Sequence, residues 1–163
     1  MLGSAIILSK YEFNSIAENL AVGTFFCTVS DSKGCPSKTD TVTISEPAIL
    51  SINSILSNSV NCYGDSTGTA TVIPLGGTSP FTYLWKNSAG DTLAQTTDTA
   101  INLPADTFTC QIDDANGCGP ISDTVIILEP VMLLVTTSSN SVSCFGFSDG
   151  SATVTPIGGI SPY

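Results

Sequence analysis

The chain has 163 residues and a formal net charge of -10, from 14 Asp and Glu against four Lys and no Arg or His. Only 11% of the residues are charged and 42% are hydrophobic, so most of the polarity comes from 22 Ser and 21 Thr. So few cations cannot neutralise a run of phosphates, and the lack of His removes Ser-His-Asp catalysis and imidazole metal sites. We therefore predict a protein that is not an enzyme, has no cofactor or metal, and does not bind nucleic acid. No membrane span is predicted, because no apolar run approaches the ~20 residues that a bilayer requires.

Two blocks of sequence occur twice. FFCTVSDSKGCPSKTDTVTISEP at 25–47 recurs as FTCQIDDANGCGPISDTVIILEP at 108–130, a shift of 83 residues. SNSVNCYGDSTGTATVIPLGGTSPF at 57–81 recurs as SNSVSCFGFSDGSATVTPIGGISPY at 139–163, a shift of 82. The chain is therefore predicted to be a tandem repeat with a unit of about 83 residues.

The unit is predicted to consist of β-strands throughout. Its runs are short, rich in Thr, Val and Ile, and bounded by Gly, Pro, Asn and Asp, which is typical of a sandwich with frequent turns. They lie at 48–61, 68–75, 81–88, 91–103, 106–114 and 122–130, and the fourth is divided into two strands, which gives seven. In the run from 106, Phe108, Cys110 and Ile112 alternate with polar residues, so one face is predicted to be buried.

Two residues give the sandwich an immunoglobulin-like character. Trp85 on the third strand and Cys110 on the sixth lie where such a sandwich places its core Trp and its sixth-strand Cys. Ala70 and Val72 occupy the second strand, so the usual disulfide between the sheets is not expected. The predicted fold class is all-β, with tandem immunoglobulin-like β-sandwich repeats of about 83 residues.

The repeat boundaries divide the chain into three segments. Residues 1–47 are predicted to be the C-terminal strands of one repeat, 48–130 a complete repeat, and 131–163 the N-terminal strands of the next. Neither outer segment is expected to bury its hydrophobic face alone. Either the chain is a window of a longer polypeptide, or adjacent copies complete each other by strand complementation. We favour the window, because repeat arrays are commonly long.

Three motifs recur in a fixed order. They are C-x-G-x-x-D/T-G-x-A-T-V at 62–72 and 144–154, G-G-x-S-P-F/Y at 76–81 and 158–163, and D-x-x-G-C at 31–35 and 114–118. With the strand that ends in E-P, they resemble the SprB-type adhesin repeat of very large secreted surface proteins of gliding and surface-attached Bacteroidota. The resemblance implies an extracellular, non-enzymatic, structural and adhesive segment of a cell-surface filament used for attachment or gliding. Its implied partners are neighbouring repeats and surface polysaccharide.

Two other functions compete with this interpretation. One is a carbohydrate-binding or spacer module of a secreted multi-domain protein, in which Phe81, Tyr83 and Trp85 would form a platform for sugars. The favoured alternative for these aromatics is a shared position on the core face at period two. The other function is a pilus-like subunit that polymerises by strand complementation.

The acidic loops offer weaker candidates. Asp113, Asp114, Asn116 and Gly117 place carboxylates and an amide within five residues, as a calcium loop does, but the EF-hand spacing and its terminal Glu are absent. Asp-Ala-Asn-Gly is also a good hairpin turn, and we favour the turn. A glycosidase pair at Asp113 and Asp114 is disfavoured, because neighbours on a strand point to opposite faces.

Five Asp-Ser/Thr triplets resemble the general O-glycosylation sequon of secreted Bacteroidota proteins, although a Thr-rich and Asp-rich chain also contains such triplets by chance. Their hydroxyl residues are Thr41, Ser66, Thr92, Thr99 and Thr124. Thr41 and Thr124 occupy the same repeat position and are the preferred sites, because a hydroxyl on the strand that leaves the turn should face solvent.

Six cysteines in an exported protein should largely be oxidised. Cys62 and Cys118 lie in turns at opposite ends of the expected sandwich, which is too far for a disulfide within one unit. Cys110 and the D-x-x-G-C cysteine of the next unit remain as partners for Cys62. The family resemblance favours the second, so Cys35, Cys62, Cys118 and Cys144 are the disulfide candidates. Cys27 and Cys110 would then be buried thiols.

Overall fold

The computed structural model describes residues 5–6 and 16–163, and every regular element within them is a β-strand. The chain forms two compact units, Met1–Pro47 and Ala48–Tyr163. The other residues of the first predicted repeat segment, 1–4 and 7–15, lie outside the described residues. Within the described residues, no helix is long and apolar enough to cross a membrane.

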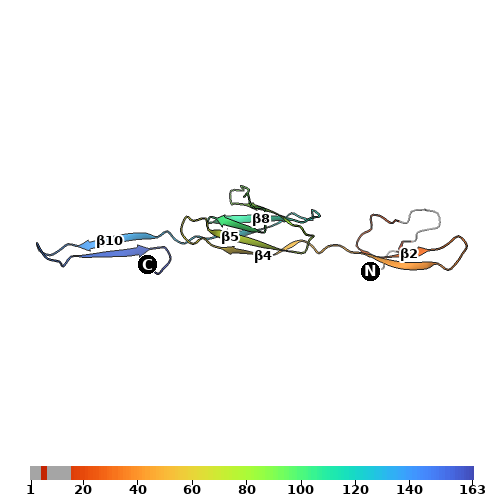
Figure 1. The fold of residues 1–163 in the computed structure, drawn as a ribbon, viewed down its shortest axis with the longest axis horizontal. Helices are drawn as coiled ribbons and strands as arrows, with labels where there is room; N and C mark the ends of the chain where they lie inside the picture. The colour runs from red at the N-terminus through yellow and green to blue at the C-terminus, as the bar shows by residue number, and fades with distance from the viewer. Residues whose placement is uncertain (1–4, 7–15) are drawn as a thin grey trace. The chain divides into compact units, whose positions relative to one another are not determined.

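Residues 48–130 form a β-sandwich of two three-stranded sheets, which confirms the predicted fold class (Figure 1). One sheet has the order β4-β5-β7 and the other the order β6-β8-β9. The strands of the first are β4 (Ser51–Asn58), β5 (Gly68–Leu75) and β7 (Thr99–Leu103). Those of the second are β6 (Thr82–Lys86), β8 (Asp106–Asp113) and β9 (Ile121–Ile127). Antiparallel three-stranded sheets with this connectivity are the arrangement of an immunoglobulin-like domain.

The prediction of two strands in 91–103 is wrong for its first half, where the structure has only an isolated bridge between Lys86 and Thr92. The reason is a turn at 87–91 that is closed by a side-chain and a backbone hydrogen bond. The Asp91 N–H donates to Asn87 Oδ1 at 2.8 Å, and the Asn87 N–H donates to the Asp91 carbonyl oxygen at 3.0 Å. These bonds engage the backbone that a strand would otherwise present to a neighbour.

The core lies between the two sheets and is centred on Trp85. This side chain is fully buried, and its indole N–H donates to the Thr97 carbonyl oxygen at 2.9 Å, so the one polar atom of the ring is satisfied. Phe108, Cys110 and Ile112 are buried in alternation along β8, as predicted. Phe81 and Tyr83 pack against the same core, which favours the core position of these aromatics over a sugar platform.

The unit Met1–Pro47 contains β1 (Ala5–Ile6), β2 (Gly23–Val29) and β3 (Lys38–Ile44), in one sheet. The β2–β3 hairpin repeats the β8–β9 hairpin: Phe25 is opposite Val42 just as Phe108 is opposite Val125. The likeness extends to the backbone, because Asn19 and Asn102, one repeat apart, both have a positive φ, of 57° and 56°.

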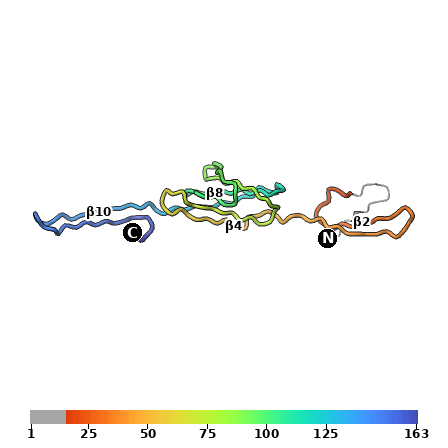
Figure 2. The backbone as a smooth tube through the Cα atoms, viewed as in Figure 1, coloured from red at the N-terminus to blue at the C-terminus, as the bar shows by residue number. Residues whose placement is uncertain are grey.

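Downstream of the sandwich, β10 (Leu134–Asn140) and β11 (Ser151–Ile157) form a two-stranded antiparallel hairpin (Figure 2). It repeats the β4–β5 hairpin, and an equivalent backbone hydrogen bond joins the open end of each hairpin, where the G-G pair follows the second strand. The Gly77 N–H donates to the Ala48 carbonyl oxygen and the Gly159 N–H to that of Val131, each at 2.8 Å.

The first glycine of each G-G pair is required by sterics. Gly76 and Gly158 have φ values of +72° and +76°, in the left-handed region. A Cβ at Gly76 would also collide with the Ile49 carbonyl oxygen, and one at Gly158 with the Met132 carbonyl oxygen.

Replacing Phe108 with Ala should lower the free energy of unfolding of the central sandwich by about 3–5 kcal/mol, because a large cavity replaces a side chain that is 1% exposed. Urea unfolding followed by the fluorescence of Trp85, the single tryptophan, measures this directly. The matched control is Phe25→Ala at the equivalent half-buried position of the other unit, which should leave the Trp85 transition unchanged. Equal shifts in the two variants would contradict the assignment of separate cores.

Candidate functional site

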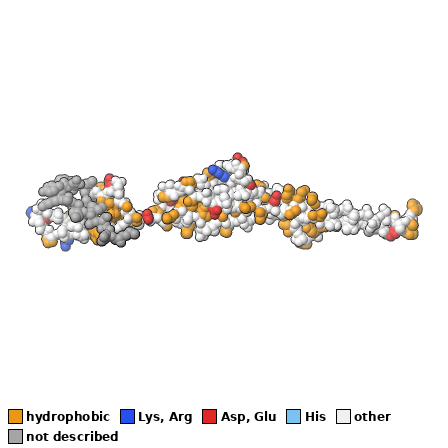
Figure 3. All heavy atoms as spheres, turned by 180° about the vertical axis from the view of Figure 1, so that it is seen from behind, with side chains coloured by type: hydrophobic (Ala, Val, Ile, Leu, Met, Phe, Trp, Pro, Cys, Tyr) orange, Lys and Arg blue, Asp and Glu red, His pale blue; other side chains and the backbone are white. Residues whose placement is uncertain are grey.

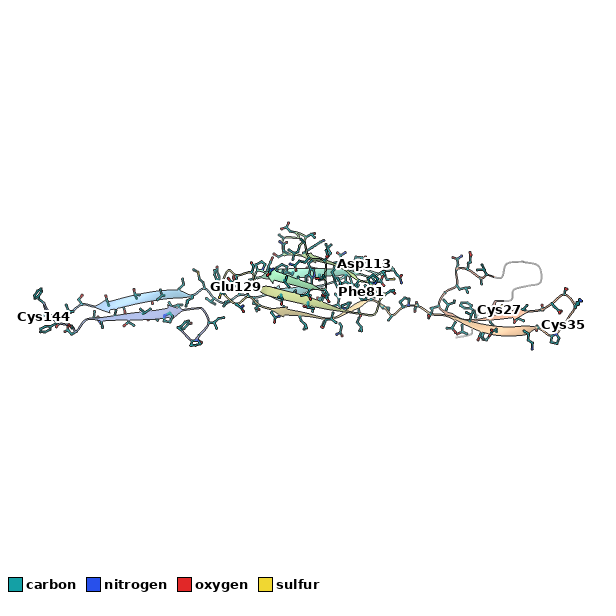
Figure 4. The ribbon with its side chains drawn as sticks, viewed as in Figure 1. Cys27, Cys35, Phe81, Asp113, Glu129 and Cys144 are labelled. Atoms are coloured by element: carbon teal, nitrogen blue, oxygen red, sulfur yellow. The ribbon has the colours of Figure 1, made fainter. Side chains whose placement is uncertain are left out.

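The loops at the two ends of the central sandwich contain several of the candidate site residues. We call the end with the β5–β6 and β8–β9 loops the Cys118 end, and the opposite end, with the β4–β5 loop and the close of β9, the Cys62 end. In Figure 4, Phe81 and Asp113 mark the first and Glu129 the second.

Asp114 connects two loops at the Cys118 end. Its side chain is 7% exposed, and its Oδ1 accepts the N–H groups of Asn116 at 3.0 Å and Cys118 at 2.8 Å. Its Oδ2 accepts the Thr78 N–H, from the other loop, at 2.9 Å. The Asn116 side chain adds a bond to Thr78 Oγ1 at 3.1 Å. This carboxylate therefore fixes the D-x-x-G-C loop to the G-G-x-S-P loop.

These bonds set the protonation of Asp114. The Cys118 N–H contributes most, and together with those of Thr78 and Asn116 it lowers the carboxyl pKa below its ordinary value despite the opposing effect of burial. A lowered pKa stabilises the fold above the unfolded-state pKa of about 3.9, and that stabilisation is lost as the pH falls through the folded-state value. Asp31, one repeat earlier, has a pKa lowered in the same direction, first by the Cys35 side chain.

The Asp-Ala-Asn-Gly segment is a turn, closed by a 3.1 Å hydrogen bond from the Gly117 N–H to the Asp114 carbonyl oxygen. Asp113 accepts the N–H groups of Asp114 and Gly119, each at 3.1 Å, so both carboxylates are used by the loop backbone. Across the described residues, no group of three or more Cys, Asp or Glu side chains is placed to hold a metal ion.

At the Cys62 end, Glu129 connects the close of the repeat to the loop that contains Cys62. Its Oε2 accepts the Gly64 N–H at 2.9 Å, and beside it the Val60 N–H donates to the Leu128 carbonyl oxygen at 3.0 Å. The E-P element of the repeat is thus bonded to the C-x-G element. The sequence gives no local signal for this pair, because its members lie 65 residues apart.

In the C-x-G loop, one side chain accepts a backbone N–H from the start of the loop. The residue at this position is Thr67 in the central repeat and Asp149 in the next. In the central repeat, Thr67 Oγ1 accepts the Asn61 N–H at 3.2 Å. In the β10–β11 hairpin, Asp149 Oδ1 accepts the equivalent Ser143 N–H at 2.9 Å, and the Ser143 hydroxyl first, then its N–H, lowers the Asp149 pKa.

All six cysteines are present as thiols. Cys62 and Cys118 are exposed at opposite ends of the sandwich, and Cys35 and Cys144 are exposed in the β2–β3 and β10–β11 loops (Figure 4). Cys110 is fully buried, and burial raises the pKa of its thiol to about 12, so it is not a nucleophile at neutral pH. Cys27, expected to be buried, is only half-buried, because among the described residues no second sheet covers its face.

The five candidate glycosylation residues differ in accessibility. Thr41, Ser66, Thr92 and Thr124 are exposed, whereas Thr99 is half-buried with its hydroxyl 3.1 Å from that of Thr71. The Asp-Thr pairs also have a structural use. The Thr41 N–H donates to Asp40 at 2.8 Å and the Thr124 N–H to Asp123 at 2.7 Å, so each Asp satisfies a donor on an edge strand.

A hollow that sequence reasoning missed lies at the Cys62 end, with a volume of about 420 Å³. It is lined from one side by Cys62 and Tyr63 and from the other by residues that include Met132, Leu133 and Ile160 at the base of the β10–β11 hairpin. Hydrophobic side chains are grouped around this junction in Figure 3. The C-x-G loop of the central repeat therefore lies beside the first residues of the following repeat.

The geometry defines a class of protein, an immunoglobulin-like repeat module. Its recurring polar motifs form hydrogen bonds that hold the loops at its two ends. The family model of the SprB repeat matches residues 56–90 and 136–163, which confirms the resemblance, and the chain thus contains SprB repeat sequence in two successive repeats. The SprB repeat family is one of cell-surface adhesin repeats, and the two matches favour an adhesin-like repeat segment. No curated protein and no solved structure matches the chain.

Replacing Asp114 with Ala should lower the melting temperature of the central sandwich by several degrees, because three backbone N–H groups lose their acceptor. Asp114→Asn should also flatten the loss of stability below about pH 4, since the group whose pKa is lowered is gone. Thermal unfolding followed by Trp85 fluorescence at several pH values measures both effects. Asp31→Ala, in the other unit, is the control, and a Trp85 transition that moves equally in it would argue against a local effect.

Proposed function

We propose that this chain is a non-enzymatic structural and adhesive segment of a large secreted cell-surface filament that serves attachment or gliding motility. Each SprB repeat adds another copy of the same sandwich elements. Repeats joined end to end would lengthen the filament and carry its tip away from the cell surface. The observation that carries the proposal is the use of the recurring polar motifs within the chain itself. Asp114, Asp113 and Glu129 all accept backbone N–H groups, and this favours a structural role over an active site.

Antibodies against the 163-residue chain should label intact, unpermeabilised cells on filaments that extend from the surface, and the same antibodies should reduce attachment. Immunogold electron microscopy and an adhesion assay test the two halves of this expectation. Labelling that needs permeabilised cells would refute the surface location. Binding of the chain to defined polysaccharides on a glycan array, with no effect of the antibodies on attachment, would favour the carbohydrate-binding module instead.

We also propose that the filament carries O-glycans at Thr41 and Thr124. Both are exposed on edge strands, and sugars there would shield a surface with few charges. Intact mass and glycopeptide mapping of the native protein should find glycan at these two positions and none at Thr99, whose hydroxyl faces Thr71. A native mass equal to that of the bare polypeptide would refute glycosylation.

A further inference from the structure

The two sheets of the central sandwich differ in charge. The strands β6, β8 and β9 contain Lys86, Asp106, Asp113 and Asp123. The strands β4, β5 and β7 contain no charged residue at all. In a chain with a net charge of -10, the β4-β5-β7 sheet can therefore meet an uncharged surface without removing a charged side chain from water.

The outward face of this sheet has exposed apolar side chains. Ala70 and Val72 in β5 are buried, so the residues that alternate with them point away from the core. We call this outward side the uncharged face. It consists of Leu56, Asn58, Thr69, Thr71, Ile73, Leu75 and Thr99. Leu56 is 58% exposed, Ile73 39% and Leu75 59%, so all three present apolar atoms to solvent.

The polar side chains of the uncharged face form hydrogen bonds with one another across the strands. The Asn58 side-chain amide donates to Thr69 Oγ1 at 3.0 Å. The Thr71 and Thr99 hydroxyl oxygens are hydrogen-bonded at 3.1 Å. Because these groups already have protein partners, covering the face with apolar material costs less than covering side chains that depend on water for hydrogen bonds.

The apolar residues of this face are not needed by the repeat fold. In the β10–β11 hairpin, Ser138 stands at the position of Leu56 and Thr155 at that of Ile73, with the same strand register. Exposed side chains on the outside of a sheet add little to the core, so the fold accepts either kind of residue. The apolar pair is therefore a property of the central repeat that its architecture does not explain.

We propose that the uncharged face of the central repeat is an adhesive surface that binds uncharged, apolar solid surfaces. The inference rests on the proposed attachment function and names the class of surface that this repeat contacts. Leu56, Ile73 and Leu75 would lose water on contact, which is the source of the binding free energy. The opposite sheet would remain toward water, with its charged residues and the proposed glycan site at Thr124.

Size and charge favour a solid surface over a protein partner. The longest strands of the sheet have 8 residues. Three such strands would cover about 26 Å by about 14 Å, or about 370 Å², whereas each side of a standard protein complex buries about 800 Å². A second copy of the chain would also bring a net charge of -10 toward another of the same sign. A solid surface requires neither a matching pocket nor an opposite charge.

Hydroxyl-radical footprinting of the 163-residue chain on methyl-coated silica particles tests the proposal residue by residue. Oxidation of Leu56, Ile73 and Leu75 should fall about fivefold or more on adsorption, because contact excludes water from these side chains. Ile126, which is 59% exposed on the opposite sheet, should be oxidised as in solution. Carboxylate-coated silica and agarose beads should protect none of the three residues.

Variants borrowed from the other repeats provide the matched test. Leu56→Ser combined with Ile73→Thr introduces the residues of the β10–β11 hairpin and should abolish the protection of Leu75. The control is Ile126→Thr, which introduces the residue of the equivalent position Thr43 and should leave that protection unchanged. Trp85 fluorescence checks that each variant keeps the central sandwich folded.

Three results would overturn the proposal. They are equal protection of both sheets on methyl-coated silica, protection of the uncharged face by agarose, and protection in solution that rises with chain concentration. The second would identify a polysaccharide ligand and the third a second copy of the chain. Antibody labelling and attachment of intact cells do not depend on which face makes contact. A failure of the footprint with blocked attachment would therefore refute this inference and leave the proposed function standing.

Discussion

A two-stranded hairpin with one apolar face needs a second pair of strands against it, and this requirement organises the whole chain. In residues 48–130 it is met by closing β6-β8-β9 over β4-β5-β7 around Trp85. The first sheet pairs the early strands β4 and β5 with the later β7, and the second pairs β6 with the late strands β8 and β9, so the core forms only when early and late segments meet. Stability is therefore a property of the combined halves rather than of either hairpin.

Hydrogen bonds between loops also join the early and late parts of the repeat. Asp114 joins the D-x-x-G-C loop to the G-G-x-S-P loop, and Glu129 joins the close of the repeat to the C-x-G loop. Each is a carboxylate that accepts backbone N–H groups, and such bonds are stronger than neutral ones. The motifs of the repeat are thus the elements that hold early and late strands together at both ends, while the strands between them need only be apolar on one face.

The sequence predicted much of this because its signals are local. Alternation located β8, turn residues bounded the strands, and the position of Trp85 indicated its place in the core. The prediction of an extra strand after Lys86 was wrong because the Asn87 side chain helps to close a turn with Asp91, and a hydrophobic pattern does not reveal such a bond. The Glu129–Gly64 bond and the hollow beside Cys62 depend on residues far apart in the chain, so pattern and spacing could not locate them.

The variable cap of the C-x-G loop gives repeats of one shape different sensitivities to acid. Thr67 accepts its N–H through a hydroxyl, which keeps its lone pairs at any pH, whereas Asp149 accepts the equivalent N–H through a carboxylate. Because the pKa of Asp149 is lowered, its contribution is retained at neutral pH and lost once the carboxylate is protonated. A substitution at this one loop position therefore decides whether the hydrogen bond that caps the C-x-G loop depends on pH.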